Sequence, residues 1–220
     1  MTDGTGRRRL RRGLIAGATV MAMFCGTGAV AATPARAGTG TGTQLSDGSF
    51  ETPVVTPGTF ADLSQGQSIG PWTVTAGLVD LIGAGYWQAA DGVQSVDLNG
   101  QTASIPGAPG TVSQTFTTTP LFAYEVSFAL AGNPLSQGDP TAGPLTKTGQ
   151  ALINGQVVKK FSFNVTGKSP TNMGYVTKEF TFLATGTSTT LEFASTNPGE
   201  GGPVIDNVRV QSCLLVICLG

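Results

Sequence analysis

From Leu45 onward, short alternations of apolar and polar residues are interrupted every few residues by glycine, proline, asparagine or aspartate. The clearest alternation covers residues 123–130. Its even-numbered positions, which share one parity, carry the apolar residues Tyr124, Val126, Phe128 and Leu130. Successive side chains of a β-strand point to opposite faces, so this segment is predicted to be a strand with one buried face. No apolar stripe of 3.6-residue period reaches helical length, and the pattern therefore favours an all-β fold.

Further short strands are predicted along the chain, separated by turns. They are residues 72–74, 78–81, 95–98, 111–117, 157–165, 176–182, 191–193 and 204–211. Threonine, valine and phenylalanine are plentiful in them, and 32 glycines and 13 prolines supply the turns. About eight to ten short strands predict a β-sandwich or jelly roll. One domain, residues 45–211, accounts for the whole pattern.

Residues 133–147 contain three prolines and no alternation. A loop of about fifteen residues is long enough to suggest a function. The alternative is a crossover that links the two sheets.

The chain has no histidine and only three cysteines. Nucleophilic sites that depend on histidine are therefore excluded, as are histidine-ligated metal sites and Cys₄ sites. We therefore expect no enzymatic activity that depends on sites of these kinds.

The N-terminal residues have the pattern of an export signal. Five arginines among residues 7–12 precede a mostly apolar run over residues 14–32 and the small residues Ala35 and Ala37. Residues 1–37 are therefore predicted to be a cleaved signal, with an N-terminal membrane anchor as the alternative. The sequence leaves Sec and twin-arginine export both open. Residues 38–44 follow as a flexible lead-in of glycine and threonine.

Removal of residues 1–37 takes away six of the 12 basic residues and one of the 13 acidic residues, which leaves a net charge of −6. An acidic domain disfavours nucleic acid and other anionic polymers and suits cations better. The mature protein is predicted to be secreted and extracellular, with no membrane association after cleavage.

Residues 212–220 form a C-terminal tail in this prediction. Cys213 and Cys218 lie in it with four residues between them. In an exported protein such a pair can form a disulfide, and a pair of free thiols is the alternative.

Asp206 has the same parity as the valines of the last predicted strand. Those valines are Val204, Val208 and Val210. A carboxylate that faces a core needs a hydrogen-bond, ionic or metal partner. Glu51 lies near the other end of the domain, and the first and last strands of a sandwich are often neighbours. Glu51 and Asp206 are therefore a candidate Ca²⁺ site, with a hydrogen-bonded Asp206 and a solvated Glu51 as the alternative.

Both tryptophans belong to a segment rich in short polar side chains, residues 72–99. Sugar sites combine an aromatic face with such groups. Trp72 is in strand-like sequence and is predicted to be a core residue, whereas Trp87 is in glycine-rich sequence and is predicted to be an exposed platform. The predicted ligand-binding residues are Tyr86, Trp87, Gln88, Asp91, Asp97 and Asn99.

The same segment holds the carboxylates Asp80, Asp91 and Asp97. A glycoside hydrolase needs two suitably spaced carboxylates. Turn formation also accounts for Asp91, which precedes a glycine. Catalysis is the weaker interpretation, and we expect the domain not to be an enzyme.

Six short motifs, in order, carry a resemblance to a known family. They are D-G-S-F-E at 47–51, W-T-V…G-L-V-D…Y-W at 72–87, D-G-V-Q-S-V-D-L-N-G at 91–100, V-S-Q-T-F at 112–116, Y-E-V-S-F-A-L-A-G-N at 124–133 and G-P-V-I-D-N-V at 202–208. Together they resemble the DUF642 family, including the bacterial choice-of-anchor C proteins. The resemblance covers about residues 45–211.

The resemblance implies a galactose-binding-like jelly roll that is extracellular and cell-wall-associated. It also implies binding of carbohydrate or wall proteins without catalysis. In related modules a structural Ca²⁺ lies between the acids that correspond to Glu51 and Asp206. Tyr175 stands where the family often has tryptophan, so ring stacking there is in doubt.

Two functional hypotheses follow. The preferred one is a secreted, non-catalytic carbohydrate-binding module for a cell-wall or environmental polysaccharide. The alternative is a cell-surface structural or protein-interaction domain that binds no sugar.

Overall fold

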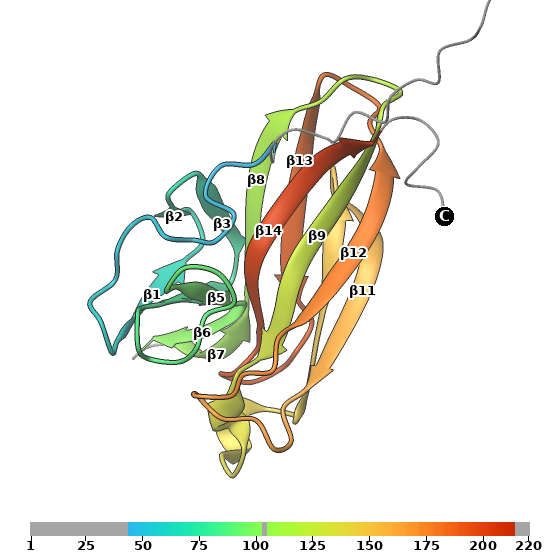
Figure 1. Ribbon diagram of the computed structural model, residues 1–220. Coiled ribbons are helices and arrows are strands. Elements are labelled where there is room, and N and C mark those ends of the chain that lie inside the picture. The colour runs from blue at the N-terminus through green and yellow to red at the C-terminus, as the bar shows by residue number, and fades with distance from the viewer. Residues whose placement is uncertain (1–43, 103–104, 214–220) are drawn as a thin grey trace, which may run out of the picture. The chain divides into compact units, whose positions relative to one another are not determined.

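The computed structural model describes residues 44–102 and 105–213. Two antiparallel sheets of six strands pack face to face (Figure 1). The first sheet has the order β1 (Phe60–Ser64), β4 (Leu78–Ile82), β5 (Ser95–Asp97), β14 (Pro203–Cys213), β9 (Ala123–Gly132) and β12 (Val176–Leu183). The second has the order β11 (Gln156–Asn164), β10 (Thr146–Ile153), β13 (Ser188–Ser195), β8 (Thr111–Thr117), β3 (Trp72–Ala76) and β2 (Ser68–Ile69).

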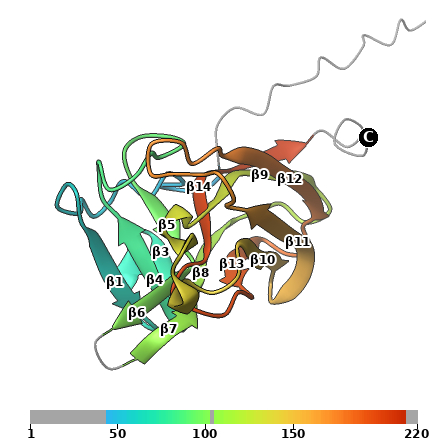
Figure 2. The ribbon, with the colours of Figure 1, turned by 90° about the horizontal axis from the view of Figure 1, so that it is seen from below.

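Two smaller features complete the described part of the chain. The strands β6 (Asn99–Thr102) and β7 (Ile105–Pro109) form a separate antiparallel ribbon. The 3₁₀ turns η1 (Pro134–Ser136) and η2 (Pro140–Ala142) lie in the loop between β9 and β10, at the lower end of the domain in Figure 1. Figure 2 views the domain from that end.

The core lies between the two large sheets. The Phe128 ring of β9 packs against the rings of Phe161 in β11 and Phe193 in β13, with centroid distances of 5.4 and 4.8 Å. The four β9 residues of the predicted buried parity are all at most 3% exposed. Apolar side chains of one parity from each sheet therefore interlock, which is how a sandwich excludes water from its centre.

The segment before β1 runs along β14. The Gln44 amide donates to the Val210 carbonyl at 2.8 Å, and the Val208 amide donates to the Gly48 carbonyl at 2.8 Å. A Cβ at Gly48 would collide with the Val208 carbonyl oxygen, so this approach requires glycine. The predicted proximity of the two ends of the domain is confirmed.

The all-β jelly-roll sandwich predicted from the sequence is confirmed. The alternation missed β1, β2, β6 and β7, and it missed β10, whose first residues were assigned to the 133–147 loop. The structure ends that loop at residue 145, because Thr146 begins β10. No helix among the described residues is long and apolar enough to cross a membrane.

Three sequence predictions reach beyond the described residues. The export signal and most of the lead-in lie outside them, as does Cys218. Cys213, at the end of β14, is disulfide-bonded.

Candidate functional site

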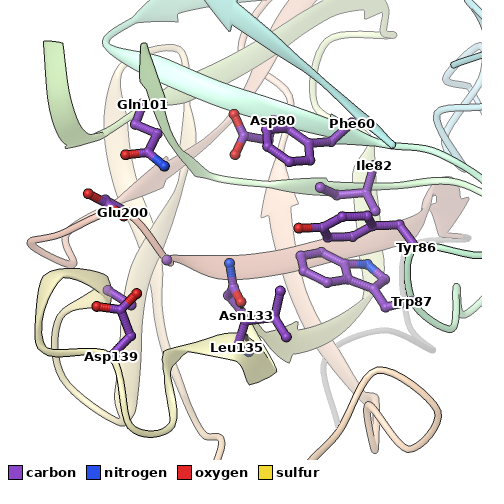
Figure 3. Close-up of a pocket in the computed structure, with 12 residues that line it drawn as sticks. Phe60, Asp80, Ile82, Tyr86, Trp87, Gln101, Asn133, Leu135, Asp139 and Glu200 are labelled. Atoms are coloured by element: carbon purple, nitrogen blue, oxygen red, sulfur yellow. Dashed lines mark hydrogen bonds between the residues drawn. The ribbon is translucent and has the colours of Figure 1, made fainter. Parts of the chain in front are cut away.

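A cavity of about 170 Å³ lies on the face of the first sheet that is turned away from the core (Figure 3). Val79 and Leu81 of β4 point into the core, so the side chain of Asp80 between them points to the opposite face. The cavity is lined by Phe60, Asp80, Ile82, Tyr86, Trp87, Gln101, Asn133, Leu135, Asp139, Ala142, Glu200 and Gly201. These residues come from the β1–β4 region, β6, the β9–β10 loop and the turn before β14.

Three aromatic rings form one side of the pocket. The Tyr86 ring meets the Phe60 ring edge-on at a centroid distance of 5.3 Å, and it meets the Trp87 ring at 5.4 Å. Gly85 adopts a positive φ of 75°, which a residue with a side chain rarely does, and so turns the chain directly before Tyr86. The Tyr86 hydroxyl points into the cavity in Figure 3.

Trp87 is buried rather than exposed. Its side chain is 5% exposed, and its Nε1 donates to Ser95 Oγ at 2.9 Å. The prediction that Trp87 is an exposed platform is therefore wrong, because the 83–87 turn folds its ring beneath Tyr86. Phe60, which is 38% exposed, and the half-buried Tyr86 present the accessible aromatic surface instead.

Carboxyl groups form a row behind the pocket. Asp62 of β1 lies directly opposite Asp80 of β4, and Asp80 lies directly opposite Asp97 of β5. Burial, followed by the charge of Asp97 and the hydrogen bond and charge of Asp62, raises the pKa of Asp80 to about 10. The Asp80 Oδ1 is buried and has no hydrogen-bond partner.

Asp97 is the structural member of this row. Its Oδ1 accepts hydrogen bonds from the Asn99 and Gly202 amides at 3.0 and 2.9 Å, and its Oδ2 accepts from Asn133 Nδ2 at 2.8 Å. Burial raises the pKa of Asp97 to about 7, against the lowering effect of these hydrogen bonds. Asp97 thereby holds the β9–β10 loop and the turn before β14 against the sheet.

Polar side chains from those two loops form the other wall of the pocket. Glu200 accepts a hydrogen bond from Thr141 Oγ1 at 3.2 Å, and it also accepts one from the Gln101 amide at 2.8 Å when the amide nitrogen faces it. Asp139 accepts hydrogen bonds from Thr141 Oγ1 at 2.7 Å and from the Thr141 amide at 2.9 Å, and these two hydrogen bonds lower the pKa of Asp139. The lining contains three acidic residues and neither lysine nor arginine.

Lys147 lies behind the wall, and its charge acts on Asp97. Its side chain is fully buried, and its Nζ donates to the Ala142 carbonyl at 2.7 Å. Burial lowers the pKa of Lys147 to about 8, although the charge of Asp97 acts in the opposite direction. Lys147 thus anchors the β9–β10 loop from below.

The structure separates the six predicted ligand-binding residues. Tyr86 and Trp87 line the pocket. Asp97 and Asn99 are completely buried, and the Asn99 side-chain amide donates to the Asn197 and Gly199 carbonyls at 2.8 and 2.7 Å. Asp97 and Asn99 therefore cannot contact a sugar directly, because both side chains are buried and hydrogen-bonded to the protein's own loops.

Gln88 and Asp91 lie away from the pocket. The Gln88 amide donates to the Pro170 carbonyl at 2.8 Å. Asp91 lines a different depression, where its Oδ2 lies 3.5 Å from the Arg209 guanidinium. Gln88 and Asp91 are close to Trp87 in the sequence, but they do not line the pocket, because the chain turns away after Trp87.

Most of the pocket residues were not predicted. Phe60, Gln101 and Glu200 belong to segments without an alternation or a recognisable motif. Asn133 and Asp139 lie in the long loop that was predicted to be either functional or a crossover. Two sequence signals pointed to this wall: the unusual length of that loop, and the motif at 124–133 that ends on Asn133.

The predicted calcium ligands Glu51 and Asp206 both bind the loop of residues 90–94. The Asp206 Oδ2 accepts from the Ala90 and Asp91 amides at 2.7 and 2.9 Å, and its Oδ1 accepts from the Asn207 amide at 2.6 Å. The Glu51 Oε1 accepts from the Val93 and Gln94 amides at 2.8 and 2.9 Å.

Both oxygens of Asp206 thus accept hydrogen bonds from backbone N–H groups. Burial raises the pKa of Asp206 to about 7. Within residues 44–102 and 105–213, no group of three or more histidine, cysteine, aspartate or glutamate side chains could hold a metal ion. This geometry is the one expected for the hydrogen-bonded alternative for Asp206, and calcium binding by Glu51 and Asp206 stays a prediction to be measured. Glu51 is not simply solvated, because it holds the same loop.

We expect EDTA to leave the melting temperature unchanged and Asp206→Asn to lower it by several degrees with or without EDTA. An asparagine would turn an NH₂ group toward backbone N–H donors, and a buried unpaired donor costs about 1–3 kcal/mol. Differential scanning calorimetry with and without EDTA measures both effects. The contrary outcome has three parts: EDTA lowers the melting temperature of the wild type, CaCl₂ restores it, and the melting temperature of Asp206→Asn responds to neither. Calcium binding at Asp206 would then be established.

Comparison with known proteins gives one family match. Among curated proteins no match is found. The solved structures that are similar to this chain include three carbohydrate-binding modules. The family 35 module from Clostridium thermocellum shares 13% identity over 68% of this chain and 97% of its own, with a TM-score of 0.43. The CBM22-1 xylan-binding domain of Paenibacillus barcinonensis Xyn10C shares 18% identity over 73% of this chain and 98% of its own, with a TM-score of 0.45.

The third similar structure is the C-terminal CBM6 of LamC from Zobellia galactanivorans, with 11% identity over 70% of this chain and 99% of its own and a TM-score of 0.40. The family model, described as "Protein of unknown function (DUF642)", matches residues 43–211. This match covers most of the chain and nearly all of the described sandwich. The chain therefore belongs to the DUF642 family.

Proposed function

We propose that this domain is a non-catalytic carbohydrate-binding module and that its ligand occupies the pocket beside Asp80. The observation that carries the proposal is the pairing of accessible aromatic rings on one wall with carboxyl and amide groups on the other (Figure 3). A sugar ring has an apolar C–H face and a rim of hydroxyls, and such a pair of walls complements both.

The aromatic wall supports the proposal through Phe60 and Tyr86. Their rings are fixed by edge-to-face contact, so little side-chain entropy is lost when a ligand packs on them. The Tyr86 hydroxyl faces the polar wall and can exchange hydrogen bonds with a sugar hydroxyl.

The polar wall supports it through Gln101, Asn133 and Glu200. Their side chains are held by contacts to neighbouring loops, as the Glu200 hydrogen bonds show. The pocket of about 170 Å³ is smaller than the ~300–1,000 Å³ typical for drug-sized ligands. A single sugar unit is therefore the ligand size that we propose.

The three carboxylates that the sequence offered for hydrolysis do not meet in the pocket. Of Asp80, Asp91 and Asp97, which were considered for a hydrolase, only Asp80 lines the pocket. Asp97 is buried with its oxygens already hydrogen-bonded, and Asp91 lies in another depression. These three residues thus provide no facing pair for the two-carboxylate mechanism. Export and a cell-wall or environmental polysaccharide as the acceptor belong to the same proposal, and they rest on the sequence.

We expect Phe60→Ala to reduce retention on polysaccharide about tenfold, because the ring supplies accessible apolar surface in the pocket, and tenfold corresponds to about 1.4 kcal/mol. Phe122→Ala is the matched control, since Phe122 is 40% exposed, close to the 38% of Phe60, and does not line the pocket. Pull-down on xylan, cellulose, chitin and peptidoglycan, followed by calorimetric titration, measures the effect.

Two outcomes would contradict the proposal. Equal retention by both variants would place the binding surface outside the pocket. Failure of the wild type to bind any polysaccharide or glycan in a broad array would favour the protein-interaction alternative.

A further inference from the structure

A second depression, of about 490 Å³, lies at the side of the sandwich where the edge strands of the two sheets, β11 and β12, are neighbours (Figure 1). Lys159 and Lys160 of β11 and Lys178 of β12 line it, and no described aspartate or glutamate does. Only six basic residues follow residue 37, so half of them meet in this one place. The depression is therefore a local positive site on a domain whose predicted net charge is −6.

The three lysines have no carboxylate partner within the protein. In the described part of the chain, the one ion pair joins Arg209 to Asp91. Glu179 follows Lys178 in β12, and successive side chains of a strand point to opposite faces, so Glu179 points away from it. Lys160 is exposed and the other two lysines are half-buried, where their charges are screened less than fully exposed ones. Their ammonium groups are thus available to an anion from outside.

Hydroxyl groups stand beside these ammonium groups. Thr148 of β10 lies directly opposite Ser162 of β11, and Thr196 Oγ1 lies 2.9 Å from Thr148 Oγ1. All three residues line the depression, and Ser162 has the same parity in β11 as Lys160. A hydroxyl both donates and accepts hydrogen bonds, as sugar hydroxyls do. The lining therefore suits a ligand that carries an anionic group next to hydroxyl groups.

No exposed aromatic ring belongs to this lining. Phe161 is its one aromatic residue, and that side chain is only 6% exposed. The ring fills the space beside Gly149 on the neighbouring strand, where a Cβ would collide with it. Proteins that bind single-stranded nucleic acid stack its bases on accessible rings. The absence of such a ring in this depression favours an acidic glycan over a nucleic acid.

We propose that this depression binds oxyanion groups along a strand of acidic polysaccharide. It shares no lining residue with the pocket beside Asp80, so the inference does not rest on the function proposed for that pocket. A lysine ammonium is a compact point charge without the fixed fork of a guanidinium, so the site accepts carboxylate and sulfate ester groups alike. The net charge of −6 describes the domain as a whole and not this face.

Lysines on edge strands have another known use. They prevent sheets of different molecules from pairing edge to edge. That use needs positive charge at β11 and β12 but no ligand. Binding measurements with defined polymers separate the two roles.

The test is biolayer interferometry on immobilised polygalacturonate, dextran sulfate and uncharged dextran, from 50 to 500 mM NaCl at pH 7. We expect the wild type to bind at least one of the two anionic polymers at 50 mM NaCl and to lose tenfold or more in affinity by 500 mM, because salt screens the attraction. Any binding to dextran should not depend on salt. The two anionic polymers distinguish carboxylate from sulfate as the recognised group.

We expect the triple variant Lys159→Gln, Lys160→Gln, Lys178→Gln to lose about tenfold in affinity at 50 mM NaCl, since three ion pairs of ordinary exposed strength contribute about twofold each. The charge-matched control is Lys168→Glu with Arg209→Gln. It lowers the net charge by the same three units at residues that do not line the depression. The control should bind the anionic polymers as the wild type does.

A measurement on the wild type alone locates the site. In a titration of ¹⁵N-labelled protein with tetragalacturonate or a sulfated dextran oligosaccharide, we expect the largest amide shifts at residues 148–149, 159–162 and 178. Largest shifts on another face would overturn the inference. Equal affinities of the triple variant and the wild type, or an equal loss in the control, would also overturn it.

Two further results would contradict this proposal. A wild type that binds neither anionic polymer at 50 mM NaCl, together with a triple variant that self-associates, would assign the lysines to protection of the edge strands. Tighter binding of a single-stranded DNA oligonucleotide than of either polymer would overturn the choice of a glycan. Failure of the protein to bind neutral polysaccharides would instead count against the proposed function and would leave this inference standing.

Discussion

We expect Trp72→Ala to lower the free energy of unfolding by about 3–5 kcal/mol, the range found when a large buried aromatic residue is truncated. Trp72 is completely buried between the sheets. Its ring packs against Phe50 at a centroid distance of 5.1 Å and against Phe193 at 6.3 Å, and its Nε1 donates to the Asp47 carbonyl at 2.9 Å. The substitution leaves a cavity and also an unpaired carbonyl oxygen.

Urea unfolding followed by circular dichroism at pH 7 measures this effect. Phe122→Ala is the control, since Phe122 is 40% exposed and should change stability by no more than about 0.5 kcal/mol. We expect Trp87→Ala to be destabilising as well, because that ring is buried and hydrogen-bonded to Ser95. A loss below about 1 kcal/mol for Trp72→Ala would contradict its place at the centre of the core.

We expect the domain to be several degrees more stable at pH 5 than at pH 7.5. Burial is the main cause that raises the pKa of Asp97 and Asp206 to about 7 and that of Asp80 to about 10. The unfolded chain releases these protons near pH 4, while the native state retains them. Between those values the unfolded state binds fewer protons, so stability falls as the pH rises.

The steepest decline should lie between about pH 4 and pH 7, where all three carboxyls contribute. Above pH 8 Lys147 acts in the opposite direction. Its pKa is lowered to about 8, so the native state releases that proton before the unfolded chain does, and stability gains from pH 8 toward ~10.4. The decline caused by Asp80 is therefore partly offset there.

Melting temperatures across pH 4–9 at constant ionic strength measure this profile. Asp80→Asn removes one of the three groups with a raised pKa and should flatten the decline, most clearly above pH 7, where the contributions of Asp97 and Asp206 diminish. Glu179→Gln should leave the profile unchanged, because Glu179 is exposed. A wild type that gains stability from pH 5 to pH 7.5 would show that these carboxyls are ionised in the folded domain.

Alternation along the chain was sufficient to predict most of the strands that form the core, although not β10. In β9 the predicted parity is the buried one, and Trp72 is a core residue as expected. These two predictions succeeded because a strand's alternation is a local property that the sequence displays directly. Parity also placed Asp206 on the core face with Val208 and Val210, and this prediction is wrong. The register of β14 shifts between Asp206 and Arg209, so Asp206 lies opposite Ala129 on the other face of the sheet, where the loop of residues 90–94 buries it.

The hydrogen-bond partners of a buried side chain cannot be read from its neighbours in the sequence. Parity predicted that Asp206 needs a partner, but the donors are backbone amides of residues 90 and 91, more than a hundred positions away. Trp87 was predicted to be exposed from its glycine-rich sequence, yet the same glycines let the turn fold the ring beneath Tyr86. A composition rich in glycine describes the freedom of the backbone and not the direction that it takes.

By itself, then, the sequence determined the class of fold, the buried face of the principal strands and the need of a buried carboxylate for partners. Only the tertiary structure decided which side chains meet in the pocket. Phe60, Asn133 and Glu200 come from three distant segments, and strand register alone aligns Asp62, Asp80 and Asp97. The physical reason is that periodicity is set by neighbouring residues, whereas register and loop position are set by packing across the whole domain.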